Sequence, residues 1–156
     1  MKLKNTSVYL LAGWMLAACS GGGFQKTENG VVVEVKQQQP TDVRKVRLEV
    51  MGEKLIHVSA TPEKEFSKEQ SLIVIPQQNK TDFKVEEQGD EVTVKTSELC
   101  AIVSKTTGEV RFTDTDGKQI LAEDSDGRTF TPVEVEGTKG YTAVSYTHLR
   151  AHETDS

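Results

Sequence analysis

The sequence predicts an all-β protein built as an antiparallel β-sandwich, and three observations support this fold class. Short runs rich in valine, isoleucine and leucine follow Cys19, and several of them alternate apolar with polar residues as half-buried strands do. Turn signals containing glycine, proline or aspartate separate these runs at the short spacing that is typical of sandwiches. No apolar stripe with the period of an α-helix follows Cys19. We expect the sandwich to be incomplete and to be preceded by a signal-peptide helix.

The first strands are expected in the first half of the chain, after a polar linker. Val46, Leu48 and Val50 alternate with charged residues, which is the pattern of a strand with one buried face. Residues 63–70 are polar and form a short stretch, so either a loop or a single helical turn is expected there. The strands expected in this part of the chain are residues 30–35, 45–50, 55–60 and 72–75.

Three turn signals organise the second half of the chain into hairpins. They are residues 88–90, the pair Thr107-Gly108 and the pair Asp116-Gly117, of which Asp-Gly is favoured in two-residue hairpin turns. Residues 124–127 contain a further Asp-Gly pair and are expected to form another turn. The strands expected around these turns are residues 83–86, 91–95, 101–103, 110–113, 118–122 and 133–136.

The beginning of the chain has the features of an export and lipidation signal. Lys2 and Lys4 precede an apolar run of eleven residues, 8–18, which suits a signal-peptide core and is too short to span a bilayer. The run ends in Leu16-Ala17-Ala18-Cys19, which resembles a bacterial lipobox. We therefore predict a signal peptide at residues 1–18 and lipid attachment at Cys19. We predict a flexible tether over residues 19–29, and an exported protein anchored in a membrane, in the periplasm or at the cell surface and preferentially in the outer membrane.

The last thirteen residues resemble a translated sequencing-library adapter. They read Val-Ser-Tyr-Thr-His-Leu-Arg-Ala-His-Glu-Thr-Asp-Ser over residues 144–156. We therefore expect the natural reading frame to continue differently after Ala143. On this interpretation, residues 30–143 are part of an N-terminal β-sandwich domain, and residues 144–156 are a non-native tail.

The net charge, the cysteine and the aromatic residues limit the classes of function that this chain could have. The net charge is −5, which argues against nucleic acid as a partner. Cys100 lies in an apolar run and is expected to be a buried structural cysteine, since nothing in the sequence brings the base His57 near it. Tyr141 is the only tyrosine or tryptophan between Cys19 and Ala143, so few flat rings are available for stacking on sugars.

No metal, cofactor or catalytic site is expected in this chain. The segment 114–117 with Glu123 has part of the pattern of a calcium loop, but Phe112 stands where the first aspartate ligand must be. His148 and His152 have the spacing of a helical metal pair, yet both lie in the adapter-like tail. The carboxylates alternate with apolar residues or lie in turns, which is typical of a solvated face.

Two stretches of the sandwich resemble glycoside hydrolase family 31. Residues 46–62 and residues 107–123 are similar to a strand pair and to a Thr-Gly hairpin in the N-terminal, galactose-mutarotase-like sandwich of the α-xylosidase and α-glucosidase branch. The resemblance implies an exo-acting retaining enzyme that removes α-linked sugars from oligosaccharides. It also implies an aspartate nucleophile and an aspartate acid/base in a downstream barrel. No residue here matches that catalytic motif, so this chain is expected to be inactive by itself.

Two functions from different classes are compatible with the sequence. The first is an accessory domain of a membrane-anchored retaining α-glycosidase, which would bind carbohydrate or shape the substrate pocket. The alternative is a stand-alone surface lipoprotein that binds glycans or a protein partner. A sandwich without any ligand is a third interpretation. The sequence of the gene beyond the codon for Ala143 would distinguish the first two.

Overall fold

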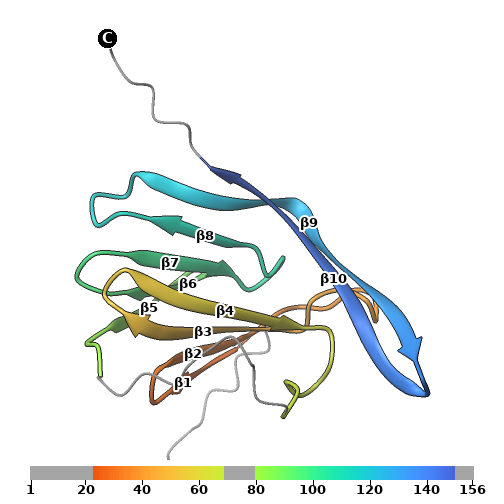
Figure 1. Cartoon of the computed structure of the whole chain (residues 1–156). Helices are drawn as coiled ribbons and strands as arrows, with labels where there is room; N and C mark the ends of the chain where they lie inside the picture. The colour runs from red at the N-terminus through yellow and green to blue at the C-terminus, as the bar shows by residue number, and fades with distance from the viewer. Residues whose placement is uncertain (1–22, 69–79, 150–156) are drawn as a thin grey trace, which may run out of the picture.

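The computed structural model describes residues 23–68 and 80–149, and it consists of two antiparallel β-sheets (Figure 1). One sheet has four strands in the order β1-β2-β3-β4, and the other has six in the order β10-β9-β8-β7-β6-β5. The described residues form strands, turns and irregular segments but no α-helix, which confirms the predicted all-β sandwich. Accordingly, the described part contains no helix long and apolar enough to cross a membrane. The predicted signal-peptide helix lies outside the described residues.

The four-stranded sheet is a meander of consecutive hairpins. Its strands are β1 (Phe24–Thr27), β2 (Gly30–Glu34), β3 (Lys45–Gly52) and β4 (Leu55–Thr61). The sheet begins at Phe24, which lies inside the predicted tether of residues 19–29. Phe24 pairs with Val33, and its side chain packs against the core. These tertiary contacts explain why a polar segment without a strand pattern in its sequence forms a strand. Residues 63–68 contain bends and no helical turn.

The six-stranded sheet contains the predicted hairpins. Its strands are β5 (Lys84–Gln88), β6 (Glu91–Lys95), β7 (Cys100–Ser104), β8 (Val110–Thr113), β9 (Gln119–Val135) and β10 (Thr138–Leu149). The turns at Gly89, Gly108 and Gly117 all have positive φ, which glycine adopts without steric cost. The strand expected at residues 72–75 lies outside the described residues.

The turn predicted at residues 124–127 is wrong, because the chain does not reverse there. Strand β9 runs for 17 residues through this segment. Ser145 of β10 pairs with Arg128 and Thr147 pairs with Glu123, so four residues of β9 lie opposite Tyr146 alone. Asp126 has a φ of 57° within this segment. Residues 124–127 therefore form a large bulge, which bends the strand instead of ending it.

The core lies between the two sheets and consists mainly of valine. Strands β2 and β3 supply one layer and β6 and β7 the other. The fully buried side chains of these four strands are Val31, Val33, Val46, Leu48, Val92, Val94, Ala101 and Val103, each with an exposed fraction of 0%. Alternate residues of each strand point into the core, as the sequence predicts.

Strands β9 and β10 form a long hairpin that reaches past the other strands. Figure 1 shows this hairpin leaving the six-stranded sheet and passing beside the end of β4. We call its distal half, β9 from Phe130 onward and β10 up to Ala143, the arm. The register pairs Phe130 with Ala143 and Val135 with Thr138 at the tip. Val144, the first residue of the adapter-like tail, and the residues after it up to Leu149 continue β10.

Candidate functional site

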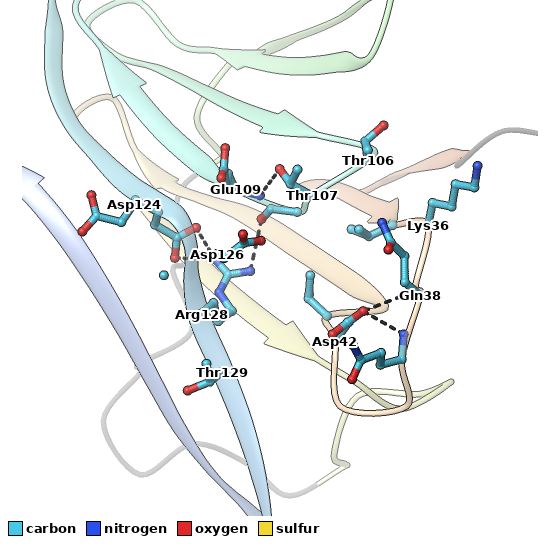
Figure 2. A pocket seen from close by; sticks show the side chains of 16 residues that line it. Lys36, Gln38, Asp42, Thr106, Thr107, Glu109, Asp124, Asp126, Arg128 and Thr129 are labelled. Carbon is cyan, nitrogen blue, oxygen red and sulfur yellow. Dashed lines mark hydrogen bonds and ion pairs between the residues drawn. The ribbon is translucent and has the colours of Figure 1, made fainter.

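A polar cleft of about 390 Å³ opens at one end of the sandwich (Figure 2). Three segments line it: the loop 35–43 that follows β2, the turn 106–109 between β7 and β8, and residues 123–129 of β9, including the bulge. These segments are far apart in the sequence and meet because β2 and β7 lie in opposing sheets. We call this site the polar cleft.

The loop side of the cleft is held by its own side chains. A carboxylate oxygen of Asp42, Oδ2, accepts hydrogen bonds from the backbone N–H groups of Gln39 at 2.8 Å and Gln38 at 3.2 Å. The side-chain amide of Gln37 donates to the carbonyls of Asp42 at 2.8 Å and Pro62 at 3.1 Å. The loop therefore has a defined shape before any ligand binds.

The turn between β7 and β8 sits directly on this loop. Gly108 has a φ of 75°, and a Cβ atom at this position would lie 2.4 Å from Cγ1 of Val43. Only glycine meets both requirements, which explains the Thr-Gly pair that the sequence shows here. The turn is also tied to the neighbouring hairpin by Asp90, whose carboxylate accepts hydrogen bonds from the hydroxyls of Ser104 at 2.6 Å and Thr106 at 2.7 Å. These two bonds, that of Ser104 first, lower the pKa of the Asp90 carboxyl.

A nearly buried ion pair forms the β9 side of the cleft. Nη2 of Arg128 contacts both carboxylate oxygens of Glu123 at 2.5 Å, and each side chain has an exposed fraction of 11%. The same carboxylate accepts the backbone N–H of Val110 at 2.8 Å and the hydroxyl of Ser145 at 2.7 Å. Arg128 also donates from Nη1 to the carbonyl of Gly108 at 3.2 Å. Figure 2 shows Arg128 reaching from β9 toward the turn that carries Thr107. The pair thus joins β8, β9, β10 and the turn.

This ion pair is not apparent from the sequence. Glu123 and Arg128 are five residues apart, and in a regular strand such residues point to opposite faces. The bulge at residues 124–127 changes this relation and brings the two side chains together. The Asp126-Gly127 pair inside a strand-rich stretch is the sequence signal that marks the bulge, although such a pair is equally typical of a turn.

A second, larger cavity of about 1130 Å³ lies between the arm and the end of β4. The hydroxyl of Tyr141 donates to Oε1 of Glu63 at 2.5 Å, which links β10 to the segment after β4. This hydrogen bond raises the pKa of Tyr141. The Tyr141 ring also packs edge-on against Phe130, with the ring centroids 6.3 Å apart. We call this space the side cavity.

The polar cleft is lined by side chains that can form hydrogen bonds with a polar ligand. The polar cleft presents hydroxyls, amides and carboxylates, the groups that hydrogen-bond a polyhydroxylated ligand. Glu123 has both oxygens engaged by Arg128, Val110 and Ser145, so it is not available as a general base. Within residues 23–68 and 80–149, no three His, Cys, Asp or Glu side chains come together as a candidate metal site.

The residues singled out in the sequence lie apart from one another. Cys100 is a buried free cysteine on β7, which confirms the structural interpretation. His57 lies on β4 in the other sheet, where its Nδ1 is 3.1 Å from Oε2 of Glu49. His148 lies on β10 with Nε2 2.5 Å from Oδ1 of Asp124, whereas Cys19 and His152 lie outside the described residues.

Comparisons with known proteins agree with the fold. The profile of the glycosyl hydrolase 31 N-terminal galactose mutarotase-like domain matches residues 45–154. The crystal structure of a GH31 α-xylosidase from Xanthomonas citri has a TM-score of 0.72 and 36% identity, over 81% of this chain and 13% of that chain. A GH31 α-xylosidase from a soil metagenome, solved with xylose, has a TM-score of 0.55 and 22% identity, over 71% of this chain and 18% of that chain. The second of these shows the fold alone. The matched region thus spans less than a fifth of either enzyme's length.

Proposed function

The chain belongs to the glycosyl hydrolase 31 N-terminal galactose mutarotase-like domain family, and on that premise we propose that it is an accessory domain of a membrane-anchored retaining α-glycosidase. The observation that carries the proposal is the family match over residues 45–154, which includes every strand from β3 onward. The chain therefore supplies the sandwich of such an enzyme, and we assign the catalytic aspartates to a barrel encoded further along the gene.

The proposed substrate class is α-linked oligosaccharides. One similar protein is named as an α-xylosidase from Xanthomonas citri, and its 36% identity supports an enzyme of the same family. The role we propose for this domain is to bind carbohydrate or to shape the substrate pocket. The polar cleft supports this role, because Asp42 and Asp90 fix its loops and its remaining polar side chains can hydrogen-bond sugar hydroxyls.

The test begins with long-read sequencing of the source gene beyond the codon for Ala143. We expect an open frame that encodes further strands and a barrel with two catalytic aspartates. The full-length product should hydrolyse a nitrophenyl α-xyloside or α-glucoside with retention, and this 156-residue chain alone should not. A stop codon close to that of Ser156 in the source DNA, or hydrolysis by the chain itself, would contradict the proposal.

One specific observation supports the alternative function, a stand-alone lipoprotein that binds glycans. Both the polar cleft and the side cavity are large enough for a sugar unit, at about 390 Å³ and about 1130 Å³. Calorimetric titration of the chain with oligosaccharides separates the two functions. Saturable binding by this chain, together with a stop codon near Ser156, would favour the lipoprotein.

We also propose that Cys19 carries a lipid that anchors the protein to a membrane. The motivation is the Leu16-Ala17-Ala18-Cys19 ending of the apolar run. Metabolic labelling with a fatty-acid analogue should mark the protein, and Cys19→Ser should abolish the label. Equal labelling of both forms would show that the lipid is elsewhere.

A further inference from the structure

The charges around the polar cleft are strongly unbalanced. Its lining has five carboxylates and two cations, so its formal net charge is −3, more than half of the −5 of the whole chain. The carboxylates are those of Asp42, Glu109, Glu123, Asp124 and Asp126, and the cations are Lys36 and Arg128. The cleft is therefore the place where the charge of a ligand should matter most.

Neither cation offsets the remaining carboxylates. Both oxygens of Glu123 contact Nη2 of Arg128 at 2.5 Å, so these two charges neutralise each other. Lys36 belongs to the loop on the other side of the cleft, and Figure 2 shows its side chain extending away from β9. A ligand that lies against the bulge of β9 therefore meets a negative potential.

Two of these carboxylates are free to accept hydrogen bonds from a ligand. Within the described part of the chain, no hydrogen bond or ion pair engages the carboxylate of Glu109 or that of Asp126. Asp126 is exposed and Glu109 is half-buried. An ionised carboxylate accepts hydrogen bonds and donates none, and its bonds from hydroxyl groups are stronger than those between neutral partners. The hydroxyls of a neutral sugar supply the donors that these two oxygen pairs require.

A sugar that carries its own carboxylate fits this lining poorly. A uronic acid is ionised at neutral pH, so its carboxylate has no proton to donate. It would face like charges at the cleft wall and would lose part of its hydration without gaining a donor from Glu109 or Asp126. The same side chains that attract a neutral sugar therefore repel an anionic one.

We propose that the polar cleft selects neutral over anionic saccharides, with Glu109 and Asp126 as its specificity-determining residues. The inference rests on the proposed function, because it takes the cleft to be a site that binds carbohydrate. Within that class it names the ligands as α-linked oligosaccharides without uronic acid, sulfate or phosphate groups. Selectivity of this kind needs a repulsive element against the wrong ligand, and the unpaired carboxylates supply it.

The test compares two probes that differ in one group. They are maltotriose and maltotriose whose non-reducing C6 is oxidised to a carboxylate. Each is titrated into the isotope-labelled full chain, as its Cys19→Ser form in a detergent without a sugar head group, and NMR shifts report both affinity and location. We expect shifts at residues 106–109 and 126–129. The neutral probe should have a dissociation constant lower by about tenfold or more at low salt, and added salt should reduce this ratio.

The double variant Glu109→Gln/Asp126→Asn removes both charges and keeps the size of both side chains. Asparagine tolerates the φ of 57° at position 126, so the bulge should persist. The variant should lower the affinity ratio by about threefold or more, mainly through tighter binding of the anionic probe. Glu86→Gln/Asp116→Asn is the matched control, because it removes the same charge outside the cleft lining, and it should leave the ratio unchanged.

The outcomes separate this inference from the proposed function. Equal affinity for the two probes, or an equal change of the ratio in both double variants, would overturn the charge selectivity and leave carbohydrate binding intact. If neither probe bound, or if the shifts lay only outside the cleft, the binding role itself would fail, and the selectivity would fail with it.

Discussion

At the scale of single residues, Glu123 organises the polar cleft. Its carboxylate joins a guanidinium, a backbone N–H and a hydroxyl that come from three different strands. Removing either partner of this ion pair should destabilise the fold, because a nearly buried charge without its partner is strongly unfavourable. The cleft wall therefore depends on one carboxylate more than on any of its other side chains.

Replacing Glu123 by glutamine should lower the stability of the chain by about 2–4 kcal/mol, because Arg128 loses its counter-charge in a nearly buried site. Urea unfolding followed by circular dichroism measures the change. The control is Glu91→Gln, which breaks the exposed pair with Arg111 and should cost less than about 1 kcal/mol. Equal losses for the two variants would show that the Glu123 pair has no special role.

The acid sensitivity of the turn should depend on Asp90. The hydroxyls of Ser104 and Thr106 lower the pKa of this carboxyl in the folded chain below its ordinary value of 3.8. Folding therefore favours the charged form, so the stabilising contribution is complete above pH 3.8 and disappears as the pH falls through the lower folded pKa.

Asp90→Asn should remove this acid-dependent step. Urea midpoints measured between neutral and strongly acidic pH should fall less steeply for the variant than for the parent below about pH 4. Asp116→Asn in the exposed turn after β8 serves as the control for the loss of one turn carboxylate. A parent and an Asp90 variant with the same acid slope would contradict the prediction.

At the scale of elements, the close approach of β2 and β3 is set by a glycine. A Cβ atom on Gly30 would lie 1.9 Å from the carbonyl oxygen of Leu48, so any larger residue must separate the two strands. Gly30 pairs with Glu49 at the start of β2, directly beside the valines of the core. The glycine therefore lets the first hairpin dock on β3 without a gap.

Gly30→Ala should destabilise the chain by about 1–3 kcal/mol through overpacking against a rigid backbone. Gly140 on β10 is the matched control, because a Cβ atom there would meet no atom within 4 Å. Gly140→Ala should be neutral or stabilise by up to about 1 kcal/mol, since alanine restricts the unfolded chain. Thermal melts of the two variants give the comparison, and a neutral Gly30→Ala would show that β2 and β3 can separate at little cost.

At the scale of the whole molecule, the sandwich has a fully buried centre and a projecting arm. The fully buried side chains lie on β2, β3, β6 and β7, whereas the exposed apolar side chains lie mainly on β9 and β10. Figure 1 shows the tip of the arm beyond the rest of the sandwich. The contact that ties the arm to the four-stranded sheet at Tyr141 is the exposed hydrogen bond to Glu63.

Hydrogen exchange should therefore follow this layout. Amides of β3 and β6 should exchange slowest, because they open only with the whole core, and those of the arm near Val135 should exchange at least tenfold faster. Mass spectrometry of peptic fragments over a time course provides the measurement. Tyr141→Phe, which removes the bond to Glu63, should accelerate exchange in the arm without changing β6. Uniform protection of arm and core would contradict this picture.

The sequence by itself determined the fold class, most strand positions and the buried state of Cys100. These features are local, because a period of two in the apolar residues and glycines at hairpin turns encode them within a few neighbouring positions. The lipidation of Cys19 and the origin of residues 144–156 are also sequence predictions, and they remain predictions. The resemblance to glycoside hydrolase family 31, drawn from residues 46–62 and 107–123, is confirmed by the family match.

Only the tertiary structure decided where the sites are. The Asp-Gly pair at residues 126–127 is compatible with a turn or a bulge, and β10 decides between them by pairing with both sides of the segment. The cleft needs three distant segments, and the contact between Tyr141 and Glu63 joins residues 78 positions apart. Such contacts depend on how the sheets pack and how β9 bends, and no local pattern of side chains encodes that geometry.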